Sequence, residues 1–300
     1  MLTVLKQVVF LYIFILIGLL FGKRSKQQGE KAGLLSFLLV NLFLPCKVFN
    51  TFSSKFTVDY ISARYPLLLC GTALLAVFVL ISVLLGGRIT KEPYHKKVYK
   101  YTLVISNYAY MGYALAENLL GTDGLADFIM FCIPFTVYIY TYGFAMLTGG
   151  EKGLKKLLNP MTVAILLGMV FGLLGITLPE IISSVLSGAS ACMTPISMLL
   201  TGMTLATFSV RELVSDKTSY LVIALKMVAL PLITWAIFLL PFLSQYRTVA
   251  VLYACLPCGL NTVVFPRLVD EDCRPGARLA FLAHLFACIS IPALMTLLGS

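Results

Sequence analysis

The chain has 300 residues, of which 59% are hydrophobic and only 12% are charged. Soluble domains carry roughly 25% charged residues, so this composition excludes an ordinary soluble protein and indicates a membrane protein. The net charge is +10, but the basic residues are spread over several short loops, a distribution that argues against nucleic-acid binding.

Apolar runs of about 20 residues, a length that lets a helix cross the hydrocarbon core of a bilayer, recur along the whole chain. The first run continues into "FGKRSKQ" without a small-residue cleavage site, so we expect it to be retained rather than removed as a signal peptide. We therefore predict an all-α polytopic membrane protein with ten transmembrane helices. The predicted segments are 8–22, 33–52, 65–87, 98–120, 126–147, 161–178, 181–208, 218–243, 248–268 and 277–298.

The distribution of basic residues predicts the orientation. The loops after odd-numbered segments, counted with the adjoining helix ends, carry 17 Lys and Arg residues, and the remaining loops and termini carry 4. The other two of the 23, Lys47 and Lys226, lie within predicted segments. Basic loops stay on the cytoplasmic side. We therefore expect a multi-pass protein of the cytoplasmic membrane with both termini outside the cytoplasm.

The charged stretch at 148–161 leaves five predicted helices on each side, so residues 1–150 and 151–300 form two candidate repeats. Because five is an odd number, a related second half would enter the membrane inverted relative to the first. Inverted repeats are typical of secondary transporters, whose substrate sites lie near the bilayer midplane.

Two pairs of residues support the repetition. Pro45 in the second segment matches Pro195 in the seventh, and Asn107 in the fourth matches Asn261 in the ninth. The order and the spacing of the two pairs are similar in both halves. The residue-by-residue similarity between the halves is weak.

The fourth and ninth segments carry residues that interrupt a transmembrane helix. Proline removes a backbone donor, and glycine loosens the chain. Backbone groups that lose their helical partners inside the membrane need protein partners or a water-filled cavity. The N-terminal end of a half-helix attracts anions, so we predict that the two segments meet at one substrate-binding site. Its candidate residues are Asn107, Tyr110 and Gly112 in "ISNYAYMGYAL" and Pro257, Gly259 and Asn261 in "YACLPCGLNTVVFP".

Charged and titratable residues inside the predicted helices are further candidates. Lys226 either holds the anion or replaces a coupling cation, or it extends its ammonium to the cytoplasmic surface. Lys47, Glu117 and His284 are candidates for charge or gating roles. Their structural alternatives are an extension of Lys47 to the outer surface, solvation of Glu117 at the interface and a helix–helix hydrogen bond of His284.

Other chemistry has little support in the sequence. Cys255 and Cys258 form a Cys-x-x-Cys motif, but thiol-redox chemistry needs exposure and stabilisation of the thiolate. Both thiols lie in an apolar segment, so packing is the favoured interpretation and a membrane thiol-redox enzyme the disfavoured one. We find no spacing of metal ligands and no phosphate-binding loop, so we expect no metal, no cofactor and no direct use of ATP.

Six motifs extend over essentially the whole chain: "LLSFLLVNLFLPCKVF", "SNYAYMGYAL", "NPMTVAILLGMVFGLLGITLP", "TPISMLLTGMTLA", "LKMVALPLI" and "ACLPCGLNTVVF". Together they resemble the auxin efflux carrier family, the PIN-like transporters, and we expect a bacterial member. The resemblance implies a scaffold from helices 1, 2, 6 and 7, a moving transport domain from helices 3–5 and 8–10, and a crossing of helices 4 and 9 at the substrate site. This chain departs from the family at Ala114, where a proline is usual, and at Lys47.

The resulting expectation is a secondary active transporter, or permease, and not an enzyme. It would move a small organic anion such as a carboxylate through the lipid bilayer by alternating access. A proton or sodium ion as the coupling ion, and a homodimer through the scaffold helices, are left open. A membrane sensor or a channel on the same fold are the alternative functions.

Overall fold

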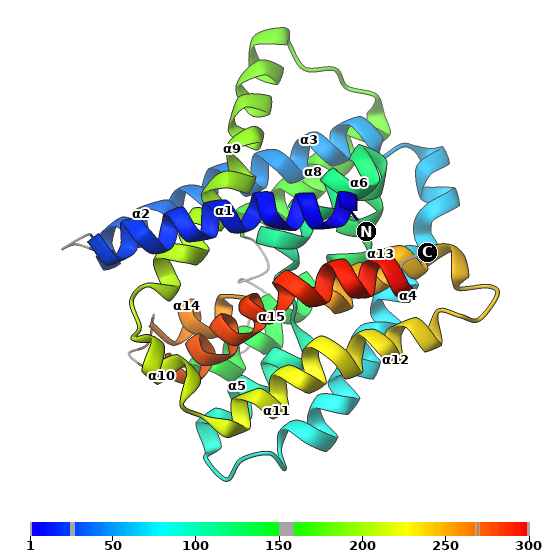
Figure 1. The fold of residues 1–300 in the computed structure, drawn as a ribbon. Coiled ribbons are helices and arrows are strands. Elements are labelled where there is room, and N and C mark those ends of the chain that lie inside the picture. The colour runs from blue at the N-terminus through cyan, green and yellow to red at the C-terminus, as the bar shows by residue number, and fades with distance from the viewer. Residues whose placement is uncertain (1, 25–27, 150–158, 268, 270, 299–300) are drawn as a thin grey trace.

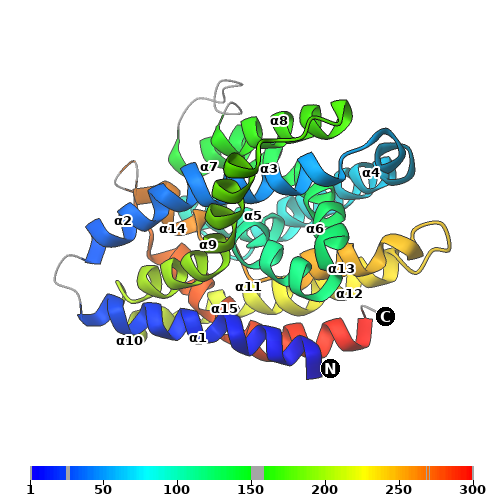
Figure 2. The same cartoon turned by 90° about the horizontal axis from the view of Figure 1, so that it is seen from above.

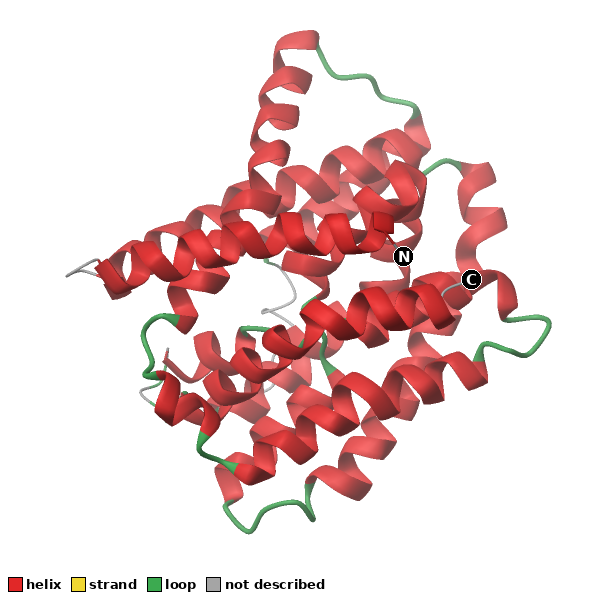
Figure 3. Ribbon diagram, viewed as in Figure 1, coloured by secondary structure: helices red, strands yellow, loops and turns green. Residues whose placement is uncertain are grey.

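The computed structural model describes residues 2–24, 28–149, 159–267, 269 and 271–298, and they are almost entirely helical (Figures 1 and 3). Residues 150–158 lie outside the described residues. They include most of the charged stretch that separates the two predicted halves, and three of its basic residues. The start of α1 and the end of α15 lie on the same side of the helical assembly (Figures 1 and 2).

The first half of the chain contains four π-helical segments, in which the backbone bonds to the fifth residue along. Such segments are rare, and they are frequent at functional sites. The elements are α1 (Leu2–Arg24), α2 (Gln28–Leu38), η1 (Leu39–Phe43), α3 (Leu44–Lys55), α4 (Val58–Ile81), η2 (Ser82–Gly86), α5 (Pro93–Val104), η3 (Tyr108–Gly112), α6 (Tyr113–Tyr138), η4 (Ile139–Gly143) and α7 (Phe144–Thr148).

The second half begins at the Asn-Pro motif, whose local role is clear. The Asn159 side chain accepts a hydrogen bond from the Thr162 backbone N–H at 3.1 Å, and Pro160 occupies the first helical position, as is typical of helix starts. The elements are α8 (Pro160–Leu174), α9 (Glu180–Leu205), α10 (Val210–Val214), α11 (Lys217–Ala224), η6 (Leu225–Ala229), α12 (Leu230–Ile237), η7 (Ser244–Tyr246), α13 (Arg247–Cys255), α14 (Asn261–Arg267) and α15 (Arg274–Leu298).

Seven stretches in the described part of the chain are long and apolar enough to cross a membrane, so this is a multi-pass membrane protein. They are Val4–Arg24, Glu30–Lys55, Val58–Gly86, Tyr108–Thr148, Glu180–Leu205, Lys217–Ile237 and Arg274–Leu297.

The seven stretches differ from the ten predicted helices for three reasons. The predicted fourth and fifth helices share one stretch, which leaves helical geometry at Gly121, where φ is +73°. The predicted sixth helix, Pro160–Leu174, is shorter than the others, and the predicted ninth is divided between α13 and α14. The count of ten and the inverted relation of the halves stay predictions.

The helices pack in two groups. In one, α1 lies along α9 and α3 along α8; in the other, α4 packs on α6, and α15 on α11 and α13 (Figure 1). The backbones of α1 and α9 approach closely because both have a glycine at the contact. A Cβ on Gly18 would lie 2.2 Å from the Leu199 carbonyl oxygen, and one on Gly202 would lie 2.0 Å from that of Ile15. Small residues of this kind commonly bring membrane helices together.

Candidate functional site

The fourth and ninth predicted helices are both interrupted, and the two interruptions meet. Residues 105–107 separate α5 from η3, and residues 256–260 separate α13 from α14. The Asn107 backbone N–H donates to the Pro257 carbonyl at 2.8 Å. Ser106 and Cys258 form an isolated antiparallel β-bridge. Two breaks that are about 150 residues apart in the sequence therefore supply hydrogen-bonding partners to one another.

The two interruptions have different local causes. The second contains Pro257 and Gly259, which disfavour a continuous helix. The first contains neither proline nor glycine, and its polar groups bond to other parts of the protein. The Tyr253 hydroxyl donates to the Val104 carbonyl at 3.0 Å, and Lys226 Nζ donates to Ser106 Oγ at 2.8 Å.

The replacement of the usual proline by Ala114 does not remove the first interruption. Ala114 is buried within α6, well past the non-helical residues 105–107. The break is supported by tertiary hydrogen bonds, and it forms without a proline in this segment.

A cavity of about 40 Å³ lies beside the meeting point of the interruptions. A water molecule needs roughly 10–15 Å³ measured in this way, so the cavity has room for water. Residues of both interruptions and of the helices that follow them, η3 and α14, line one part of the wall, and residues of η1, α3, η4 and α8 line the rest. The lining residues are Val40, Leu44, Ser106, Asn107, Tyr108, Ala109, Tyr110, Ile139, Tyr140, Met161, Gly259, Leu260 and Asn261.

The N-terminal end of the η3–α6 helix forms part of this wall. Tyr108, Ala109 and Tyr110 are its first residues and line the cavity. The helical hydrogen bonds to the Asn107 carbonyl come only from the N–H groups of Met111 and Gly112, at 3.2 and 3.0 Å. The first N–H groups of a helix have no partner within it and form its positive end. This end of the helix provides donors suited to an anion.

Four of the predicted site residues, Asn107, Tyr110, Gly259 and Asn261, line the cavity. Asn261 Nδ2 donates to the Tyr101 hydroxyl at 2.9 Å, so the amide is held in place.

Asn107 is held by His284. His284 Nδ1 lies 2.7 Å from the Ala280 carbonyl, which can only accept, so this nitrogen carries a proton. In the neutral ring, Nε2 is then an acceptor for Asn107 Nδ2, at 3.2 Å. His284 therefore lies behind the cavity wall as a support for Asn107.

Gly112 and Pro257 do not line the cavity, and their observed roles are in the packing of the crossing. A Cβ on Gly112 would lie 2.6 Å from Leu256 Cδ1 and 2.9 Å from Phe128 Cε1, so a larger residue would require these side chains to shift. Pro257 contributes its carbonyl to the bond with Asn107.

Lys226 also lies outside the cavity lining, and its ammonium does not extend to the cytoplasmic surface. The residue is fully buried. Its Nζ atom bonds to Ser106 and lies 5.5 Å from the ring centre of Phe78 and 5.8 Å from that of Tyr253. The surface interpretation of this lysine is therefore wrong.

Lys47 and Glu117 form an ion pair with each other, a contact that the sequence analysis missed. The side chain of Lys47 is 12% exposed and that of Glu117 is 34% exposed. Lys47 is therefore held by Glu117 rather than extended to the outer surface, while Glu117 keeps part of its exposure. The pair connects α3 to α6 and lies outside the cavity lining.

Ser106, Tyr108 and Tyr140 are polar lining residues that the sequence analysis did not single out, and Tyr140 is the one that lies outside the two interrupted segments. It lies in η4, within the tyrosine-rich run "YIYTYG", and that run of hydroxyl groups in an apolar helix was the available signal. Four of the π-helical segments supply the cavity wall or its support: η1, η3, η4 and η6.

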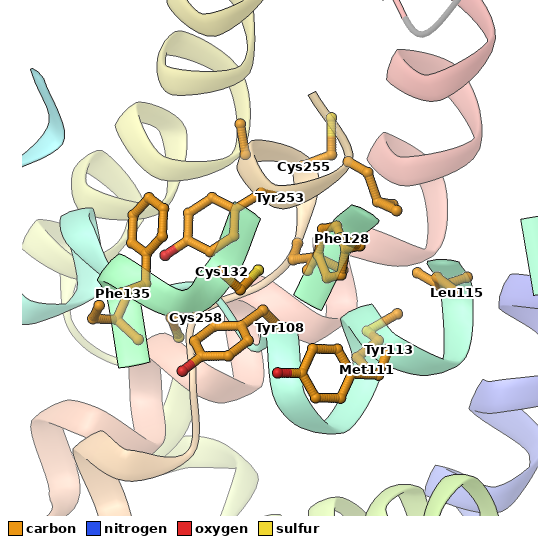
Figure 4. Close-up of a cluster of buried hydrophobic side chains, with 14 of the residues drawn as sticks. Tyr108, Met111, Tyr113, Leu115, Phe128, Cys132, Phe135, Tyr253, Cys255 and Cys258 are labelled. Carbon is orange, nitrogen blue, oxygen red and sulfur yellow. The ribbon is translucent and has the colours of Figure 1, made fainter. Parts of the chain in front are cut away.

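The Cys-x-x-Cys motif packs inside the protein. Cys255 and Cys258 are free thiols and fully buried. They lie near the rings of Tyr108 and Tyr253 in a cluster of apolar and aromatic side chains (Figure 4). Thiol exchange needs access for a second thiol, which this packing does not provide.

Comparison with known proteins agrees with the sequence motifs. The model of the membrane transport protein family matches the chain twice, over residues 3–156 and 149–295. No curated protein matches the chain significantly. The two family matches together span nearly the whole chain and include both interruptions. The chain therefore belongs to the membrane transport protein family, the family of the auxin efflux carriers and PIN-like transporters.

Proposed function

We propose that this family member is a secondary active transporter that moves a small organic anion, such as a carboxylate, across the cytoplasmic membrane by alternating access. The observation that carries the proposal is the meeting of two interrupted helices beside a cavity lined by both of them. Irregular backbone inside a membrane protein is tolerated where it lines a cavity.

The charge of the proposed substrate follows from the donors at the cavity. The N-terminal end of η3 faces it, and the Lys226 ammonium lies one hydrogen bond behind Ser106. No Asp or Glu is among the lining residues of this cavity. Backbone N–H groups and a nearby cation favour an anion over a cation or a neutral solute.

The proposed movement takes place between the two groups of helices. The cavity wall combines the interruptions and η4 with Val40, Leu44 and Met161 from η1, α3 and α8. In the proposed cycle, α1–α3, α8 and α9 act as the scaffold, and the remaining helices carry the site from one side of the membrane to the other. Both chain ends lie outside the cytoplasm in this proposal.

Uptake into proteoliposomes tests the proposal. The panel consists of formate, acetate, pyruvate, malonate, succinate, malate and citrate, with pH and sodium gradients imposed separately. Asn107→Ala and Asn261→Ala are expected to abolish uptake because they remove the amides that line the cavity. Asn41→Ala is the matched control, because Asn41 is an exposed asparagine of η1 whose amide donates only to the Phe37 carbonyl.

Circular dichroism of each purified variant establishes that it is folded. Transport at wild-type rates in both cavity variants would contradict the assignment of the site. Failure of the wild-type protein to move any acid in the panel would contradict the proposed substrate class.

A further inference from the structure

The buried Lys226 has no carboxylate partner among the residues that the structure describes. The residue lies in η6, between α11 and α12, with no measurable exposure. The ion pairs found in the described part of the chain are Lys47–Glu117, Lys55–Asp123, Arg64–Asp127 and Arg274–Asp272, and none includes Lys226.

The titratable groups around Lys226 are weak acids and one imidazole. Cys255 and Tyr253 face it from α13, and Cys258 faces it from the second interruption. Two further titratable groups belong to helices that pack against η6. They are His284 on α15, which bonds to Asn107, and Tyr101 on α5, which bonds to Asn261. From α4, the uncharged ring of Phe78 lies near the ammonium.

This environment disfavours a permanent positive charge. A buried cation without a counter-ion has lost its hydration and gains little in return. The faces of Phe78 and Tyr253 attract a cation, and so does the Ser106 hydroxyl, but these contacts are weaker than an ion pair. A lysine in such a place readily exists as the neutral amine.

Ser106 connects this lysine to the cavity. Lys226 Nζ donates to Ser106 Oγ at 2.8 Å, and Ser106 lines the cavity. Because its oxygen already accepts from Lys226, the Ser106 hydroxyl hydrogen is available to donate to a bound anion. An anion in the cavity would then supply the counter-charge that Lys226 lacks. The Ser106 side chain would connect the two through hydrogen bonds.

We propose that Lys226 is the proton-binding site that couples transport to the proton gradient, so that one proton is taken up with each anion. With the cavity empty, Lys226 is a neutral amine. When an anion enters, Lys226 binds one proton and becomes an ammonium, and both are released on the other side. Binding of the anion and of the proton strengthen each other reciprocally. This inference rests on the proposed function, because it requires an anionic substrate in this cavity.

The wild-type protein in proteoliposomes provides the first test. A pH-sensitive dye inside the vesicles reports proton movement while uptake of each acid of the panel is measured, and protein-free vesicles report passive entry of the protonated acids. With one proton per monoanion and no membrane potential, a gradient of one pH unit is expected to sustain about tenfold accumulation. A sodium gradient alone is expected to sustain none.

Substitution at Lys226 provides the second test. Lys226→Met keeps the volume of the side chain and cannot bind a proton, so proton movement with the anion is expected to be lost. Lys226→Arg keeps a permanent charge, so exchange of internal for external anion is expected to continue without proton movement and with little dependence on pH. Circular dichroism reports whether each variant is folded.

The outcomes separate this inference from the proposed function. Anion uptake by the wild-type protein without accompanying protons would overturn the role of Lys226 and leave the carrier assignment intact. Proton-coupled uptake that persists unchanged in Lys226→Met would overturn it as well. No uptake of any acid in the panel would overturn the proposed function, and this inference with it.

Discussion

Removal of one hydroxyl group tests whether the first interruption depends on tertiary hydrogen bonds. Tyr253 is fully buried, and its hydroxyl donates to the carbonyl of Val104, the last residue of α5, at 3.0 Å. Tyr253→Phe keeps the ring, which lies 4.0 Å from that of Phe135 between centres. It removes the hydroxyl, which also accepts from the Ser106 backbone N–H at 3.4 Å. A buried polar group that loses its partner costs about 1–3 kcal/mol. For a chain of this size each kcal/mol lowers the unfolding midpoint by roughly 2–4 °C.

Tyr113→Phe is the matched control. Tyr113 is equally buried and lies in the same aromatic cluster (Figure 4), but its hydroxyl has no hydrogen-bond partner among the described residues. Removal of this hydroxyl is expected to leave the midpoint unchanged or to raise it slightly, since an unsatisfied group is lost. Thermal unfolding in detergent, followed by circular dichroism at 222 nm, measures both variants. Equal losses of stability in the two would refute the reasoning.

Three further predictions concern other contacts. Gly202→Ala is expected to lower the free energy of unfolding by about 1–3 kcal/mol or more, because the new Cβ would meet a backbone carbonyl of α1. Gly188→Ala on the same helix meets no atom within 4 Å and should leave the unfolding midpoint unchanged or raise it, since alanine favours a helix over glycine. In a double-mutant cycle, Lys47→Gln and Glu117→Gln should show a coupling of about 0.5–3 kcal/mol in unfolding free energy, and strict additivity would contradict the ion pair. Burial raises the pKa of Asp216, but the hydrogen bonds that it accepts outweigh burial and lower the pKa to about 2. The wild type should therefore be more stable than Asp216→Asn at neutral pH, and this difference should be lost as pH falls from about 4 to 2. A stability difference that acid leaves unchanged would count against this role of Asp216.

The sequence predicts the second interruption better than the first, for a local reason. Pro257 and Gly259 disfavour a helix wherever they occur in a membrane span. The residues at 105–107 carry no such preference. Their non-helical conformation depends on partners contributed by Tyr253, Lys226 and the second interruption. Local propensity contains no information about partners so far away in the chain.

The same limit explains why the sequence did not predict the ion pair between α3 and α6. Lys47 and Glu117 are 70 positions apart, and each alone looks like a residue that reaches the membrane surface. Their pairing follows from the packing of α3 against α6. The π-helical segments that shape the cavity also escape prediction, because one extra residue in a helical turn leaves the apolar composition of a span unchanged.

The hydrogen bonds of the site indicate which parts would move together in the proposed cycle. The two interruptions are joined through Asn107 and Pro257, and Lys226 is bonded to the same crossing. Separation of these elements would leave several backbone groups without partners inside the membrane, at a cost of several kcal/mol for each group. The contact between this unit and the other group of helices is different. Its polar links in the described part of the chain include the bond from Ser197 Oγ to the Tyr110 carbonyl, at 3.2 Å, and the pair of Lys47 with Glu117.

Water that enters between the two groups of helices can replace these links one at a time. Both lie where α3 and α9 meet the η3–α6 helix, and the apolar side chains that face the cavity from η1, α3 and α8 require no partner when they separate from it. The surface along which the two groups of helices would slide is therefore the surface that contains the cavity. A rigid crossing that moves along this surface would expose the proposed anion site to one side of the membrane at a time, without breaking the hydrogen bonds that form the crossing.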